Sequence, residues 1–124
     1  MFEDVPRALK RWHAQNKDIR IFSSGSVLAQ KLLFEHTDAG DLGVLLNGYF
    51  DTNIGPKTDP RSYQRIAAAF ELTAGEILFI SDTDTELNAA RSAGMETMFS
   101  VRPGNRPVES PLHRTVTSFD FVFP

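Results

Sequence analysis

The stretch that decides the fold is Ile77-Leu78-Phe79-Ile80-Ser81-Asp82. Four consecutive apolar residues are followed by a polar pair, and Gly75 separates this run from the helix predicted before it. A short apolar run with such boundaries is typical of a strand that is buried on both faces. Strands of this kind belong to parallel sheets that helices cover, so the run predicts a strand over 77–81 in an α/β protein.

Helices are predicted on both sides of this strand. Asp59 and Pro60 are residue types that begin helices, and an apolar face follows them. The members of that face are Tyr63, Ile66, Ala67 and Phe70. After Asp82 a second helix is predicted to end near Gly94, and a strand over 97–101 follows before the Pro/Gly-rich loop RPGNRP.

The first part of the chain predicts a further set of alternating elements. Apolar residues recur at helical spacing over 5–16, with Asp4 as the expected N-cap and Pro6 in the first turn. The next expected elements are a strand over 19–22, a helix from Val27, a loop with a short helix over 38–48, and a short strand at Tyr49 and Phe50. The tail over 115–121 is compatible with a strand or with a turn.

Helices that alternate with short apolar strands indicate a Rossmann-like parallel sheet, because parallel strands require crossover connections. A chain of 124 residues is long enough for one hydrophobic core and short for two. We therefore expect a single domain over 1–124.

Composition narrows the classes of function. The net charge is −3, with 13 basic and 16 acidic residues, which disfavours nucleic acid and anionic membrane surfaces as partners. The absence of cysteine excludes disulfides and thiolate metal sites, and a reducing cytoplasm is the expected compartment. No stretch approaches the roughly 20 apolar residues of a membrane helix.

Polar residues directly after predicted strands are the candidates for a ligand site, because ligands of open α/β sheets bind beyond the carboxyl ends of the strands. Ser23 and Ser24 follow the first strand, where hydroxyls and helix N-terminal amides bind anions such as phosphate. Lys57 lies in a loop before a helix, where its ammonium could neutralise a phosphate. The alternatives are an ordinary N-cap serine and a solvated lysine.

Three acidic residues follow the strand predicted over 77–81. Asp82 ends that strand, with Asp84 and Glu86 close behind, and carboxylate oxygens are the ligands that Mg²⁺ prefers. The alternative is that Asp82 caps the next helix while Glu86 interacts with its dipole. Phosphoryl transfer needs an anion cradle, a cation and a metal together, so we expect Ser23, Ser24, Lys57 and Asp82 to converge on one surface.

Four spans resemble enolase-phosphatases of the haloacid dehalogenase superfamily: IFSSGSVLAQKLLF, GYFDTNIGPK, ILFISDTDTELNAARSAGM and RPGN. The resemblance implies that Ser23 and Ser24 contact a phosphorylated small-molecule substrate and that Lys57 binds its phosphate. It also implies that Asp82 ligates Mg²⁺ and that Glu86 ligates it through water or organises the loop. The implied reaction is enolisation and dephosphorylation of 2,3-diketo-5-methylthiopentyl-1-phosphate to an acireductone of methionine salvage.

The family pattern is incomplete in these residues. The acidic nucleophile motif and the strand before it have no match before Ile19, and of the cap after it at most the trailing edge falls near Met1 to Pro6. Neither Asp51 nor Asp120 is assigned as the nucleophile. We therefore identify no catalytic residue. In the family this strand lies centrally, between the strands that carry Ser23 and Asp82, so its absence predicts a gap with unpaired backbone groups. The chain is then expected to rearrange, to pair with a partner or to be marginally stable. The expected partner is the missing N-terminal segment or a second copy.

Two functions remain open at this point. The first is the C-terminal part of a magnesium-dependent enolase-phosphatase that is inactive by itself. The second is a non-catalytic module of the same fold that binds phosphate or Mg²⁺. A response-regulator receiver is a weaker variant of the second, because no strand-end aspartate precedes the first helix pair.

Overall fold

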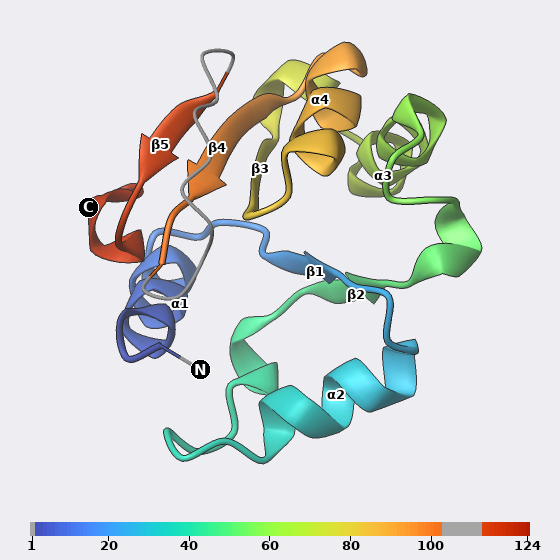
Figure 1. The fold of residues 1–124 in the computed structure, drawn as a ribbon. Coiled ribbons are helices and arrows are strands. Elements are labelled where there is room, and N and C mark those ends of the chain that lie inside the picture. The colour runs from blue at the N-terminus through green and yellow to red at the C-terminus, as the bar shows by residue number, and fades with distance from the viewer. Residues whose placement is uncertain (1, 103–112) are drawn as a thin grey trace. The chain divides into compact units, whose positions relative to one another are not determined.

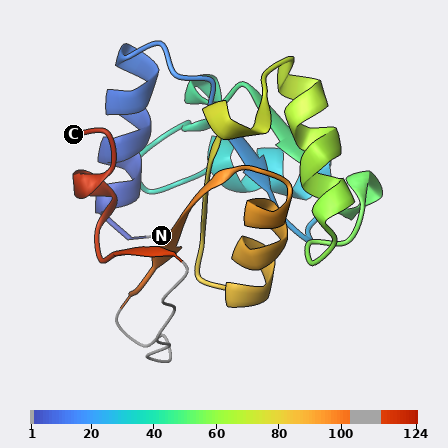
Figure 2. The ribbon, with the colours of Figure 1, turned by 90° about the horizontal axis from the view of Figure 1, so that it is seen from above.

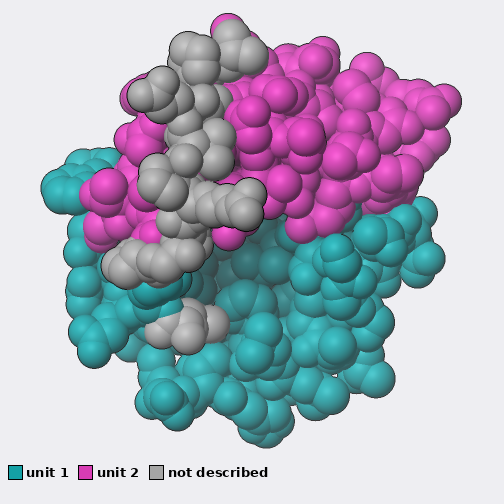
Figure 3. All heavy atoms as spheres, in the orientation of Figure 1, with its two compact units in different colours: residues 1–53, 119–124 teal, residues 54–118 magenta. Residues whose placement is uncertain are grey.

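Helices and parallel strands alternate along the computed structural model, which describes residues 2–102 and 113–124. The chain forms two compact units (Figure 3). Unit 1 contains Met1–Asn53 and Phe119–Pro124, and unit 2 contains Ile54–Ser118. The single domain expected over 1–124 stays a prediction.

Unit 1 contains a two-stranded parallel sheet. Its elements are α1 (Asp4–Ala14), β1 (Arg20–Phe22), α2 (Val27–Glu35) and β2 (Gly48–Phe50). Strand β1 pairs with β2, so that Ile21 lies opposite Tyr49, and α2 packs against β2. Helix α1 buries Ala8, Leu9 and Trp12, which recur along one face as the helical spacing predicts.

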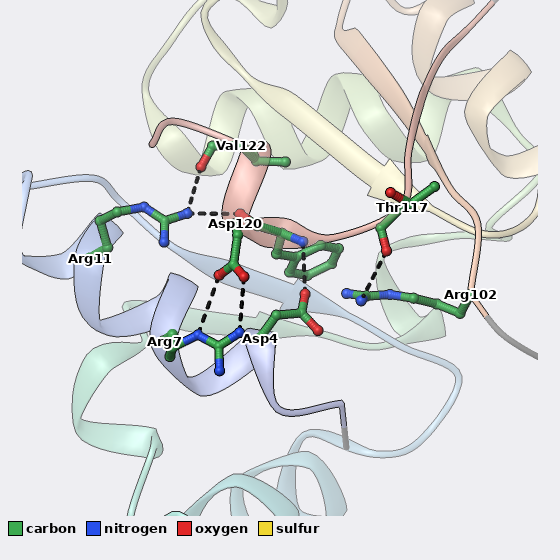
Figure 4. Close-up of polar contacts among 8 residues, drawn as sticks. Asp4, Arg7, Arg11, Arg102, Thr117, Asp120 and Val122 are labelled. Carbon is green, nitrogen blue, oxygen red and sulfur yellow. Dashed lines mark hydrogen bonds and ion pairs between the residues drawn. The ribbon is translucent and has the colours of Figure 1, made fainter.

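The C-terminal tail of unit 1 is bound along α1 (Figure 4). A short 3₁₀ helix, Phe119–Phe121, begins this segment, and the Asp4 carboxylate accepts a hydrogen bond of 2.7 Å from the Phe119 amide. Asp4 is therefore not the N-cap that its residue type predicted. Glu3 precedes the helix instead, without a side-chain cap, because the Asp4 carboxylate is used by the tail.

Unit 2 contains a three-stranded parallel sheet in the order β3-β4-β5. Its elements are α3 (Pro60–Phe70), β3 (Leu78–Ser81), α4 (Asp84–Ser92), β4 (Glu96–Ser100) and β5 (Arg114–Val116). Helix α4 packs against β3 and β4, and α3 packs against α4 (Figures 1 and 2). The buried side chains of Tyr63, Leu87 and Phe99 contribute to the core of this unit.

The α/β fold with parallel strands near 19–22, 77–81 and 97–101 is confirmed. The tail contains both alternatives, a strand at Arg114–Val116 and then a 3₁₀ turn. Complete burial of the deciding strand was wrong. The residues of β3 are half-buried, because β3 has one strand neighbour and lies at an edge of its sheet. The RPGNRP loop lies outside the described residues beyond Arg102.

Strands β1 and β3 are both edge strands of their sheets. Each is the strand that precedes one of the candidate ligand loops, at Ser23 and at Asp82. Within residues 2–102 and 113–124, none of the helices combines the length and the apolar character that a membrane crossing requires.

Candidate functional site

The loop after β1 presents Ser23 and Ser24 in unit 1. The Ser23 amide donates to the carbonyl of Phe50 at 3.1 Å, and the Ser23 hydroxyl accepts from the amide of Gly25 at 3.2 Å. Neither serine caps the next helix, because Ser26 is the N-cap of α2 and accepts from the Ala29 amide. The alternative reading of Ser23 and Ser24 as helix caps is therefore wrong.

Gln30 holds this loop in place, and sequence reasoning missed it. Its side chain is 4% exposed, and its Nε2 donates to the carbonyls of Gly25 and Phe50, both at 2.9 Å. Among the described residues, its Oε1 is buried without a hydrogen-bond partner. A lone glutamine in an apolar helix is the one signal in the sequence that could have identified it, since buried polar groups need partners.

The loop that carries Lys57 is held by side chains of α3 in unit 2. The hydroxyl of Tyr63 donates to the Lys57 carbonyl at 2.6 Å, and that of Ser62 donates to the Pro56 carbonyl at 2.6 Å. Gly55 has a φ of +140°, and a Cβ there would collide with the Ser62 hydroxyl. Glycine is therefore required at this position for both its conformation and its size.

Lys57 and Glu86 form an ion pair in unit 2. The Lys57 ammonium lies 3.0 Å from the Glu86 carboxylate, and the two side chains are 23% and 13% exposed. The Ser81 hydroxyl also donates to Glu86 at 3.3 Å, so the carboxylate joins the end of β3 to the loop before α3. Lys57 is thus an ordered, paired cation, and its alternative as a freely solvated lysine is wrong.

Asp82 follows β3 directly and is exposed. It accepts a hydrogen bond of 3.1 Å from the Thr83 hydroxyl. Thr83, and not Asp82, is the N-cap of α4, so the cap alternative for Asp82 is wrong. Since Glu86 lies in the first turn of the same helix, Asp82, Glu86 and Lys57 belong to one region of unit 2.

The carboxylates of this region fit part of a magnesium site. Among residues 2–102 and 113–124, no group of three or more His, Cys, Asp or Glu side chains could hold a metal. Protein Mg²⁺ sites often use one or two carboxylates together with water and substrate phosphate. Exposed Asp82 fits one such ligand, whereas Glu86 is engaged by Lys57 and Ser81. The metal role of Glu86 stays a prediction.

The structure brings two of the predicted site residues into contact, but it does not test whether all of them converge. Lys57 and Glu86 are in contact, and Asp82 begins the turn before the helix that carries Glu86. Ser23 and Ser24 belong to unit 1 and the other three residues to unit 2. The convergence of the serines with Lys57 and Asp82 therefore stays a prediction.

A separate cavity of about 590 Å³ lies in unit 2 away from these residues. Its described lining includes Glu96 at the start of β4 and Arg114 at the start of β5. Asp82 follows the carboxyl end of β3, and the three strands are parallel. The cavity is thus at the opposite end of the strands from Asp82.

His113 is a buried polar residue that the sequence did not single out. Its Nδ1 lies 2.6 Å from the Thr97 hydroxyl, and its Nε2 lies 2.7 Å from Oδ1 of Asn88. Burial lowers the pKa of His113, with Arg91 acting in the same direction and Asp84 opposing both. The residue links α4, β4 and the start of β5, which is a structural role.

The family of haloacid dehalogenase-like hydrolases matches residues 1–94. The chain belongs to this family. It is also 48% identical over 124 residues to enolase-phosphatase E1 of Methylococcus capsulatus, covering all of this chain and 54% of that protein. The protein of Arabidopsis thaliana named "Probable bifunctional methylthioribulose-1-phosphate dehydratase/enolase-phosphatase E1" is 48% identical over 98% of this chain and 24% of its own length.

Solved structures of other proteins have the same fold. The crystal structure of the Unknown transcript 4 protein of Saccharomyces cerevisiae matches with a TM-score of 0.86 and 38% identity, over 96% of this chain and 55% of that one. A dehalogenase at 24% identity matches with a TM-score of 0.81 over 53% of its length. The chain thus spans about half the length of these proteins, and the predicted resemblance to enolase-phosphatase is confirmed.

Proposed function

We propose that residues 1–124 form the phosphate-binding and magnesium-binding part of an enolase-phosphatase that acts in methionine salvage. The observation that supports this most strongly is the Lys57–Glu86 ion pair, whose carboxylate also accepts from Ser81 at the carboxyl end of β3, directly before Asp82 in the chain. Similarity to enolase-phosphatase E1 along the whole chain supports the same function. The proposed substrate is 2,3-diketo-5-methylthiopentyl-1-phosphate, and the products are the acireductone and phosphate. The expected compartment is the cytoplasm.

Each proposed ligand group has a defined task. The Lys57 ammonium neutralises charge on the substrate phosphate, and it does so by exchanging part of its contact with Glu86 for the phosphate oxygens. The hydroxyls of Ser23 and Ser24 donate hydrogen bonds to the same group. Asp82 would hold Mg²⁺, which when bound supplies positive charge to the transferring phosphoryl group.

The 124-residue chain by itself is expected to bind phosphate without hydrolysing a phosphate ester. Phosphoryl transfer in this family passes through an acidic nucleophile, and no residue of this chain is assigned to that role. A segment that carries the nucleophile is therefore the proposed partner, and a second copy of the chain is the alternative. The non-catalytic module remains the outcome if no such segment restores activity.

Titration of the ¹⁵N-labelled chain with inorganic phosphate, followed by NMR, tests this proposal. We expect Lys57→Met to weaken phosphate binding by about tenfold, because one charge-assisted contact is lost. Lys10→Met is the matched control, since Lys10 is an exposed lysine on α1. Equal phosphate affinity in the wild-type chain and in Lys57→Met would contradict the proposed role of Lys57.

A further inference from the structure

Three side chains of α3 bind the backbone of the Lys57 loop. Tyr63 donates to the carbonyl of Lys57, and Ser62 donates to that of Pro56, both at 2.6 Å. Arg65 donates to the Ile54 carbonyl at 2.9 Å. Backbone carbonyls outside helices and strands need other partners, and α3 supplies them along this loop. The loop is consequently fixed to a rigid helix.

Tyr63 is the member of this set that acts on Lys57 itself. Its side chain is 0% exposed, and its ring meets that of Phe79 on β3 edge to face at 5.0 Å. Burial, and secondarily the charge of Glu86, raises the pKa of Tyr63, so that its hydroxyl stays protonated and remains a donor. Tyr63 thus packs its ring in the core of unit 2 and donates its hydroxyl hydrogen to the Lys57 backbone.

Lys57 is held at both ends by this arrangement. Tyr63 fixes its carbonyl at 2.6 Å, and Glu86 fixes its ammonium at 3.0 Å. A long lysine side chain loses conformational entropy when it binds a ligand, and a fixed backbone and a preset direction reduce that loss. Effective charge stabilisation also requires a cation that is already in place.

We propose that Tyr63 is a positioning residue for Lys57, which it orients for a phosphate group through the hydrogen bond to the Lys57 carbonyl. This inference rests on the proposed phosphate role of Lys57. It assigns to the tyrosine hydroxyl a task that is separable from the packing of its ring. Tyr63→Phe keeps the contact with Phe79 and removes only the donor.

A double-mutant cycle separates positioning from a general effect on stability. Phosphate affinity is measured by NMR titration with inorganic phosphate for the wild-type chain, Tyr63→Phe, Lys57→Met and the double variant. We expect Tyr63→Phe to weaken binding by about threefold to tenfold when Lys57 is present, and to have no effect when it is Met. Tyr49→Phe is the matched control, because Tyr49 is the only other tyrosine and lies on β2 of unit 1.

A second measurement keeps the inference testable if the chain does not bind phosphate. The mobility of the Lys57 side chain and the hydrogen exchange of the amides at 55, 57 and 58 are expected to increase in Tyr63→Phe and to stay unchanged in Tyr49→Phe. Absence of Lys57-dependent phosphate binding would reject the proposed function alone. Unchanged mobility and exchange in Tyr63→Phe, or equal weakening with and without Lys57, would reject the positioning role.

Discussion

At the scale of single residues, His113 has a hydrogen-bond pattern that fits the neutral imidazole. Oδ1 of Asn88 is an acceptor, so Nε2 of His113 donates to it, and Nδ1 is left to accept from the Thr97 hydroxyl. One tautomer of the neutral ring satisfies both contacts. Protonation would turn Nδ1 into a donor and would place a charge in a buried position, where it is costly.

The pH dependence of stability tests this role of His113. Burial lowers its pKa in the folded state, so its contribution to stability is present above about pH 6.5, the ordinary pKa. That contribution is lost as the pH falls below this value and through the pKa of the folded state. We expect urea unfolding, followed by far-UV circular dichroism, to show a lower free energy of unfolding at pH 5 than at pH 7.5.

His113→Gln should flatten this dependence, and His36→Gln should leave it as it is, because His36 is exposed. An equally steep dependence in His113→Gln would show that another group is responsible.

Some features of the candidate site residues follow from the sequence and others do not. The roles of Ser23, Lys57 and Asp82 in ligand binding stay predictions. Their places, after a strand or before a helix, could be predicted from the sequence. The contact between Lys57 and Glu86 could not, because it joins residues far apart in the chain whose meeting depends on packing of α3 against α4. The hydrogen bonds of Gln30 and Tyr63 to the carbonyls of Gly25 and Lys57 were also missed, because they join a helix to the loop before it without a sequence pattern that marks them.

At the scale of elements, helix starts were predicted correctly where the cap interaction is local. Asp59 caps α3 and accepts from the Arg61 amide, as its residue type and Pro60 predicted. Asp4 has the same residue type, but its carboxylate binds the amide of Phe119, which lies at the other end of the chain. Long-range contacts of this kind override local preference, and they are invisible in a single sequence.

The tail on α1 is expected to stabilise unit 1. Trp12 donates from Nε1 to the carbonyl of Val122 at 2.7 Å, and its ring lies 5.7 Å from that of Phe119. Deleting residues 119–124 leaves the indole N–H without this partner and exposes the ring, at a cost of about 1–3 kcal/mol for the donor alone if it stays buried.

Trp12 is the single tryptophan, so its fluorescence reports on the tail directly. We expect the deletion to shift the emission to longer wavelength and to lower the unfolding midpoint. Arg7→Ala is the control, because its ion pair with Asp120 is exposed and contributes little. An unchanged emission spectrum after deletion would contradict docking of the tail on Trp12.

At the scale of the whole molecule, the alternation of helices and strands predicted the α/β class and the parallel pairing. Those features depend on periodicity and on the need for crossovers, both of which are properties of the sequence. The resemblance to enolase-phosphatases predicted a gap between the strands that precede Ser23 and Asp82, and β1 and β3 belong to separate sheets. That a missing central strand causes this division stays a prediction. The chain spans about half the length of its enolase-phosphatase relatives, and β1 and β3 are both edge strands.

The most direct test is to supply the other half of the family fold in trans. The 124-residue chain is mixed with the part of the Methylococcus capsulatus enolase-phosphatase E1 that it does not match, and phosphate release from the diketo phosphate is followed with Mg²⁺. We predict release that requires both pieces and the metal, and that Lys57→Met and Asp82→Asn abolish. If the two pieces form a stable complex and no phosphate is released, the account of this chain as part of a phosphatase is wrong.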